Sequence, residues 1–170
     1  MSGDSAGKKI VYLGAPSGDV TKEVMAELRR LGDVQLERIG SEFEFRRTFD
    51  GQYGQGKRPD LFVLNDYFPW TSGPDLLRMV PEPDDVAYGG VENAAFRCLE
   101  YRGETHKPPI PTIVVSLMSG FPEAFAAYKL PEGQNARCVV YTGGGKFREE
   151  IQAAARGIFS SEEAAGGTGI

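Results

Sequence analysis

The sequence is poor in the residues that most often build disulfide, metal and histidine-based sites. It holds two cysteines and one histidine in 170 residues. Two cysteines are too few for a disulfide framework, and Cys98 and Cys138 lie in apolar stretches, so we predict buried free thiols. The single histidine, His106, lies in a polar loop without an acid or base pattern around it. This context argues against a metal or catalytic role for it.

Long apolar runs and an excess of positive charge are also missing. No stretch approaches the roughly 20 apolar residues of a membrane span, and the N-terminus has no apolar stretch typical of a signal peptide. Lys and Arg number 19 against 24 Asp and Glu, which gives a net charge of −5. Phosphate binding needs clustered cations, so this balance argues against nucleic acid as a partner. We therefore expect a cytoplasmic protein that binds neither membranes nor nucleic acids.

The residues that are present suit one globular domain. Hydrophobic residues make up 41% of the chain, enough to bury a core. Both ends are small, polar and rich in glycine, so we predict disordered tails at residues 1–7 and 160–170. The predicted domain is therefore an α/β unit over residues 8–159.

Apolar segments alternate with amphipathic helical segments along this domain. Ser41 and Glu44 form a capping-box pattern at the start of the second helix. The predicted strands are 8–13, 34–39, 61–64, 113–115 and 137–141. The predicted helices are 19–31, a short one beginning at Ser41, 90–103, 122–128 and 147–159. This alternation predicts a doubly wound, five-stranded parallel sheet with right-handed crossovers.

The third predicted strand is the clearest indication of a functional site. Its sequence, PDLFVLNDYFP over residues 59–69, holds four apolar residues between turn-forming ones, which is typical of a strand buried on both faces. Its C-terminal end carries Asn65 and Asp66. In open α/β sheets, ligands bind at the carboxyl ends of the strands. We therefore expect the site of this protein at Asn65 and Asp66.

The same stretch resembles the third strand of two-component response-regulator receiver domains. That family typically shows Pro-Asp, four apolar residues, a phospho-accepting Asp and a Pro four positions later. Counted from Pro59 or from Pro69, the acceptor position falls on Asn65. The resemblance covers roughly residues 8 to 159 and implies the flavodoxin-like strand order 2-1-3-4-5. It also implies a receiver that lacks its acceptor.

The other positions of the implied phosphorylation pocket have lost their charges as well. Receivers bind Mg²⁺ through an acidic pair after the first strand, where this chain has Gly14 and Ala15. Ser116 matches the hydroxyl residue after the fourth strand. The Lys that receivers place after the fifth strand falls on Gly143. The degenerate pocket implied by the resemblance comprises Gly14, Ala15, Asn65, Asp66, Ser116, Thr142 and Lys146. The resulting interpretation is a pseudo-receiver that holds no metal and no cofactor.

Asp66 is the alternative acceptor. Successive residues of a strand point to opposite faces, so Asp66 faces away from the pocket if Asn65 faces into it. We therefore interpret Asp66 as a capping or solvated carboxylate.

Residues 70–88 form an irregular connection after the third strand, longer than a receiver needs by about 15 residues, and long loops are often functional. We predict that this insertion folds over the C-terminal edge of the sheet with Trp70 buried there. The aromatic residues Tyr67, Phe68 and Trp70 lie at its root. Aromatic residues are enriched in interaction hot spots, although capping of the sheet is an equal alternative for these three.

These observations predict a phosphorylation-independent signalling or adaptor domain, without enzymatic activity, that binds a protein partner. The resemblance implies that the partner engages residues 122–128 and 137–141, and a homodimer remains open. The candidate interaction surface comprises Tyr67, Phe68, Trp70, Phe125, Tyr128 and Tyr141.

The alternative is a small-molecule or nucleotide site, or an enzyme, that uses a neutral pocket formed by Gly14, Asn65, Ser116 and Thr142. Residues 14–18 resemble the glycine-rich first loop of nucleoside deoxyribosyltransferase-like proteins, which would make Asp66 or Glu92 catalytic. The second glycine-rich stretch, residues 142–146, lacks the full P-loop pattern and follows the last strand. We therefore predict that it is a flexible strand-to-helix joint.

Overall fold

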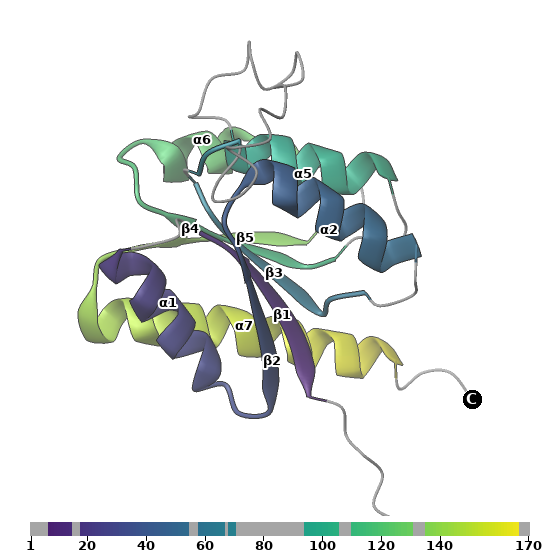
Figure 1. The fold of residues 1–170 in the computed structure, drawn as a ribbon. Coiled ribbons are helices and arrows are strands. Elements are labelled where there is room, and N and C mark those ends of the chain that lie inside the picture. Colours follow the sequence, from purple (N-terminus) through teal and green to yellow (C-terminus); the bar gives the residue numbers. More distant parts are fainter. Residues whose placement is uncertain are drawn as a thin grey trace, which may run out of the picture.

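The computed structural model describes residues 7–14, 18–54, 58–66, 68–70, 94–105, 110–130 and 135–166. Strands and helices alternate along this part of the chain (Figure 1). The strands are β1 (Lys8–Leu13), β2 (Val34–Ile39), β3 (Leu61–Asn65), β4 (Thr112–Ser116) and β5 (Ala136–Val140). The helices are α1 (Asp19–Arg29), α2 (Glu42–Gly54), α5 (Ala94–Thr105), α6 (Phe121–Ala127) and α7 (Gly144–Gly166). Ala15, Tyr67, Glu92, His106 and residues 71–93, which include most of the predicted insertion, lie outside the described residues.

The five strands form one sheet in the order β2-β1-β3-β4-β5, and every neighbouring pair is parallel. This arrangement confirms the predicted doubly wound sheet and its strand order. Helices α1 and α7 cover one face of the sheet, and α2, α5 and α6 cover the other (Figure 1). The inner strands β3 and β4 are buried along their whole length, because they have neighbours on both edges and helices on both faces. The third inner strand, β1, is buried over its last four residues.

Alternation along the strands divides the core into one layer on each face. On β1, Ile10 and Tyr12 pack toward α1 and α7, whereas Val11 and Leu13 pack toward α2 and α5. On the α2 side, the aromatic rings of Phe45, Phe49 and Phe62 lie within 6 Å of one another. The direction of each strand residue is thus fixed by its position in the strand, including the residues at the strand ends.

The start of α2 is tied to the chain that leaves β3. The Ser41 hydroxyl accepts a hydrogen bond from Glu44 N at 3.2 Å, and the Glu44 carboxylate accepts one from Gly40 N at 2.8 Å. This is the predicted capping box, with the return bond made one residue earlier than in the standard form. The carbonyl groups of Pro69 and Trp70 accept hydrogen bonds from the backbone amides of Glu42 and Phe43 at the helix start. The exit from β3 is therefore directed toward α2.

The C-terminal helix differs most from its prediction. Helix α7 begins at Gly144 and ends at Gly166, whereas we predicted residues 147–159 and a disordered tail from residue 160. Residues 160–166 are helical, because SSEEAAG contains strong helix formers that continue the last turn. Gly143 and Gly144 adopt positive φ angles of 70° and 68°, which allow the sharp turn from β5 into the helix. Among the described helices, none combines the length and apolar character that a membrane crossing requires.

Candidate functional site

Asn65, at the predicted acceptor position, faces the α1 and α7 side of the sheet. The hydroxyl of Tyr12 donates a hydrogen bond to Asn65 Oδ1 across 3.1 Å and lies 3.4 Å from the hydroxyl of Thr21 on α1. All three side chains are buried. Burial, the largest cause, raises the pKa of the Tyr12 phenol, so the hydroxyl keeps its proton and acts as a donor. The acceptor position is therefore part of a neutral, internally paired group.

Gly14 lies directly under the end of the Tyr12 ring. A Cβ atom at residue 14 would lie 2.3 Å from the Tyr12 hydroxyl oxygen and 2.4 Å from Cζ. The phenol therefore occupies the space that any side chain at this position would need. The position that the receiver resemblance assigns to an acidic residue is filled by a neighbour two residues earlier on the same strand.

Asp66 faces the opposite side of the sheet from Asn65, as the alternation along a strand requires. Its Oδ2 accepts hydrogen bonds from Leu117 N at 2.8 Å and Met118 N at 2.9 Å. The side chain is fully buried, and its Oδ1 has no hydrogen-bond partner among the described residues. Asp66 thus anchors the loop between β4 and α6 through two backbone amides, which is a capping role and not a solvated one.

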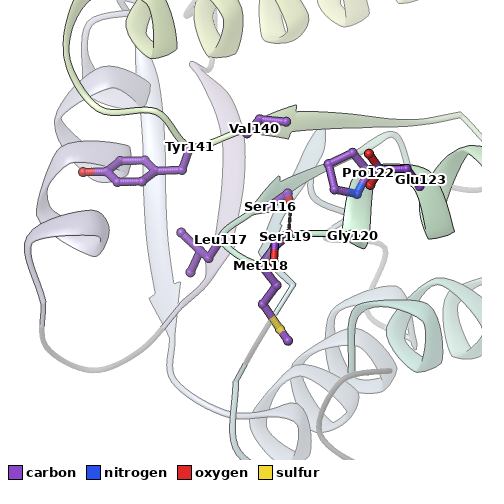
Figure 2. Close-up of a pocket in the computed structure, with 9 residues that line it drawn as sticks. All are labelled: Ser116, Leu117, Met118, Ser119, Gly120, Pro122, Glu123, Val140 and Tyr141. Carbon is purple, nitrogen blue, oxygen red and sulfur yellow. Dashed lines mark hydrogen bonds between the residues drawn. The ribbon is translucent and has the colours of Figure 1, made fainter.

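A cavity of about 280 Å³ opens beside this loop, at the ends of β4 and β5 (Figure 2). Of the predicted site residues, Ser116 and Tyr141 line it. The Ser116 hydroxyl donates a hydrogen bond to the carbonyl oxygen of Met118 at 3.3 Å, so this hydroxyl is paired within the β4–α6 loop. The lining residues are Ser116, Leu117, Met118, Ser119, Gly120, Pro122, Glu123, Val140 and Tyr141.

The structure therefore does not gather the predicted pocket residues at one place. Gly14 and Asn65 lie on the α1 side with Tyr12, Asp66 lies under the β4–α6 loop, and Ser116 lines the cavity. The alternative neutral pocket of Gly14, Asn65, Ser116 and Thr142 is likewise not assembled, because Asn65 and Ser116 face opposite sides of the sheet.

The two predicted pocket residues that follow β5, Thr142 and Lys146, are exposed. Thr142 lies on the surface, and the Lys146 side chain, 75% exposed, pairs with Glu150 across 3.7 Å on the same helix. Lys146 therefore points along α7.

Glu23 on α1 links this helix to the segment that joins β5 to α7. Its carboxylate accepts a hydrogen bond from the Tyr141 hydroxyl at 2.6 Å and another from Gly144 N at 3.0 Å. Figure 2 shows the Tyr141 ring turned away from Ser116 and toward α1. The carboxylate also raises the pKa of the Tyr141 phenol, chiefly through the hydrogen bond. No pattern in the sequence connects Glu23 with Gly144, because 121 positions separate them.

The described aromatic residues of the candidate interaction surface lie in different places. Phe68 is only 1% exposed and belongs to the core beneath α2 and α5, so its assignment to a surface was wrong. It follows β3 on the side of the sheet where the Phe45 and Phe62 rings already pack. The alternative interpretation, in which it caps the sheet, is the one that its burial supports.

Trp70 packs against α2. Its ring lies 5.7 Å from the Phe43 ring in an edge-on contact and 5.4 Å from the Arg46 guanidinium. The side chain is half-buried, and its indole nitrogen is shielded from solvent. Phe125 and Tyr128, both partly buried, pack in the cluster around Phe121 that lies between α5, α6 and β4. The members of the candidate surface that the structure describes therefore do not form one continuous patch.

Two apolar side chains at the cavity are exposed. Leu117 and Val140 are 40% and 41% exposed, and both line the cavity. Val140 falls within the predicted partner-binding segment 137–141, whereas Leu117 was not singled out. The available signal for Leu117 was an apolar residue that directly follows a buried strand and precedes a turn.

The receiver resemblance implies a Mg²⁺ ion, and the residues present do not fit one. Mg²⁺ requires oxygen ligands in near-octahedral geometry, usually one or two carboxylates with several waters. Gly14 offers no side-chain ligand, Asn65 Oδ1 is engaged by the Tyr12 hydroxyl, and Asp66 Oδ2 is engaged by two amides on the other face. Within the described part of the chain, His, Cys, Asp and Glu side chains form no group of three or more that could hold a metal.

Comparison with known proteins identifies the fold and not a sequence family. No protein-family model and no curated protein matches this chain. Solved structures match over most of its length. A two-component response regulator from Cytophaga hutchinsonii superposes with a TM-score of 0.58 at 8% identity, covering 91% of this chain and 98% of that chain. The N-terminal domain of a response regulator/sensory box/GGDEF protein from Carboxydothermus hydrogenoformans gives 0.57 at 11% identity, covering 93% and 98%.

A third match is the phosphorylated cyanobacterial phytochrome response regulator RcpA, with a TM-score of 0.52 and 16% identity over 92% of this chain and 96% of that chain. The chain therefore has the fold of response-regulator receiver domains. At these identities, the likeness establishes the fold alone.

Proposed function

We propose that this protein is a receiver-like signalling or adaptor domain that works without phosphorylation and acts by binding a protein partner. The observation that carries the proposal is the hydrogen bond from Tyr12 to Asn65 over Gly14. An amide at the acceptor position cannot form an acyl phosphate. Its oxygen is already engaged by a neutral phenol, where a receiver has a metal-binding acidic group.

Asp66 does not take over the acceptor role. Its Oδ2 holds two backbone amides of the β4–α6 loop, and the side chain is sealed from solvent. Attack through the other oxygen, Oδ1, would require a phosphodonor to reach a carboxylate that is fully buried. Its position supports a structural role that shapes the loop carrying Leu117 and Met118.

The partner surface that the proposal favours is the rim of the cavity between β4, α6 and β5. Leu117 and Val140 present apolar side chains there, next to Met118 and Pro122 (Figure 2). Protein interfaces are anchored by a few side chains that fill such hollows. The volume of about 280 Å³ falls just below the roughly 300–1,000 Å³ of most small-molecule sites, which favours one partner side chain over a whole ligand.

A small-molecule site is the second candidate function, and the same cavity is the observation in its favour. Ser119 and Glu123 supply polar groups at the wall, as a ligand site would need. Asp66, one of the two residues predicted to be catalytic in a deoxyribosyltransferase-like enzyme, is turned under the loop and does not line the cavity. We therefore place this function second.

Intact-mass measurement tests phosphorylation independence directly. The wild-type protein is incubated with acetyl phosphate and Mg²⁺, alongside a receiver known to be phosphorylated by that donor. We expect an adduct on the control receiver and none on this protein. A phosphoryl adduct that disappears in the Asp66→Asn variant would contradict the proposal and would identify Asp66 as the acceptor.

The partner surface is tested with Leu117→Asp and Val140→Asp, which place a charge on the cavity rim. The control is Ala153→Asp on the exposed side of α7. Partners are first captured by in-cell crosslinking with the wild type, and each purified partner is then titrated with all three variants. We expect both rim variants to lose at least tenfold in affinity and the control to bind normally. Equal binding by all of them would remove this surface from the proposal.

A further inference from the structure

We infer that the phenol of Tyr12 is a built-in plug that stands in the place of the cation and its carboxylate ligand, so the site stays closed to Mg²⁺ even when acidic residues are restored at positions 14 and 65. This inference rests on the proposed function, since it supplies the physical reason why the pocket is inactive. Tyr12 was not among the residues singled out from the sequence.

The plug occupies the space of a side chain at residue 14. A Cβ atom there would lie 2.3 Å from the hydroxyl oxygen, 2.4 Å from Cζ and 2.8 Å from Cε1 of Tyr12. These three atoms form the far end of the ring. A carboxylate at residue 14 would extend beyond its Cβ into the same volume, so it cannot coexist with the phenol in this position.

Neither partner in this contact is free to move away. The Gly14 amide donates a hydrogen bond to Ile39 O at 3.2 Å, which continues the pairing of β1 with β2. The Tyr12 ring is fully buried, with its hydroxyl between Asn65 on β3 and Thr21 on α1. Interiors are packed at crystal density, so a ring held at both ends has no nearby space to rotate into.

The plug also satisfies the polar groups that the lost site leaves behind. Asn65 is buried at the end of a central strand, and a buried carbonyl oxygen without a partner costs free energy. The Tyr12 hydroxyl supplies the donor from within the chain. The Tyr12 hydroxyl therefore supplies the hydrogen bond that a neutral side chain at residue 65 needs. The phenol can take this position only because residue 14 is glycine.

The test restores the carboxylates with and without the plug. The variants are Gly14→Asp/Asn65→Asp and Tyr12→Val/Gly14→Asp/Asn65→Asp, and the probe is Mn²⁺ alone, followed by electron paramagnetic resonance and calorimetry. Valine suits the buried strand and removes the ring. We expect the triple variant to bind one Mn²⁺ at least tenfold more tightly than the double variant. Equal affinity of the two, or a folded triple variant that binds no Mn²⁺, would overturn the inference.

A packing measurement keeps the inference testable if the acidic variants do not fold. Gly14→Ala is made in the wild type and in a Tyr12→Val background. We expect Gly14→Ala to lower the Tm by roughly 5 °C in the wild type and to have little effect without the ring. Equal losses in both backgrounds would show that the phenol does not occupy this space. These tests measure metal binding and stability, whereas the test of the proposed function measures phosphorylation. The inference can therefore fail while the wild type still resists phosphorylation, and it can hold even if the wild type is phosphorylated.

Discussion

The guanidinium of Arg97 on α5 makes hydrogen bonds to both carboxylate oxygens of Glu42, the first residue of α2. The Arg97 Nη2 atom lies 2.8 Å from Glu42 Oε2, and its Nε lies 3.1 Å from Oε1. Arg46 adds a third donor to Oε1 at 2.7 Å. Both partners of the pair are buried. This pair joins the two helices that cover β3 on the side of Asp66.

Removing the charge of Glu42 should be costly, because it takes from the buried Arg97 guanidinium the carboxylate that accepts its hydrogen bonds. We predict that Glu42→Ala lowers the free energy of unfolding by about 3–5 kcal/mol. The control is Glu37→Ala, which breaks a partly exposed pair with Lys9, and such pairs contribute about 0–1 kcal/mol. Urea denaturation of both variants measures the difference. Similar losses for the two would mean that the buried pair does not hold α2 and α5 together.

The anchoring of the β4–α6 loop by Asp66 can be measured in the same way. Asp66→Ala leaves two backbone amides without their acceptor, so we predict a loss of about 1–3 kcal/mol. Asp66→Asn keeps one acceptor oxygen and should lose less. Asp19→Ala, at a fully exposed carboxylate, is the control and should lower the stability much less than Asp66→Ala. Faster hydrogen exchange at Leu117 and Met118 in Asp66→Ala would locate the effect.

The thiol of Cys138 should react slowly at neutral pH. Burial, with a smaller contribution from the Asp66 carboxylate, raises its pKa from 9.0 to about 11. The thiolate is the reactive form, so a shift of this size reduces its population roughly 100-fold. We predict slow modification by a maleimide in the folded protein and fast modification in urea, resolved by mass spectrometry of the Cys98 and Cys138 peptides. Asp66→Asn should accelerate the reaction at Cys138. An unchanged rate would show that the Asp66 carboxylate does not influence the pKa of this thiol.

Alkaline pH should destabilise the fold through Tyr101. Burial, followed by the hydrogen bond to Asp50, raises the pKa of this phenol from 10.0 to about 12. The folded state therefore holds the proton longer than the unfolded state, and the resulting stability is present below pH 10 and lost as pH rises toward 12. We predict that Tyr101→Phe flattens this part of the pH dependence in urea denaturation. If the free energy of unfolding changes with pH equally in the wild type and the variant, groups other than Tyr101 cause the alkaline loss of stability.

The sequence by itself determined the frame of the fold. Strand runs such as residues 61–65, and helices with apolar residues at helical spacing, depend on local periodicity, which is readable along the chain. The capping box at Ser41 is equally local. The alternation of these elements then left few topologies open, because parallel strands need right-handed crossovers. The opposite directions of Asn65 and Asp66 followed from the same two-residue period.

Only the tertiary structure decided what fills the site. Tyr12 reads as one more apolar residue of a buried strand, and its contact with Asn65 joins residues 53 positions apart. The links from Asp66 to Leu117 and from Glu23 to Gly144 span 51 and 121 positions. Such contacts depend on which side chain reaches a gap once the sheet is assembled, and periodicity carries no information about that reach. The sequence therefore showed that residues 14 and 65 carry no carboxylate, and packing alone placed the Tyr12 phenol against both of them.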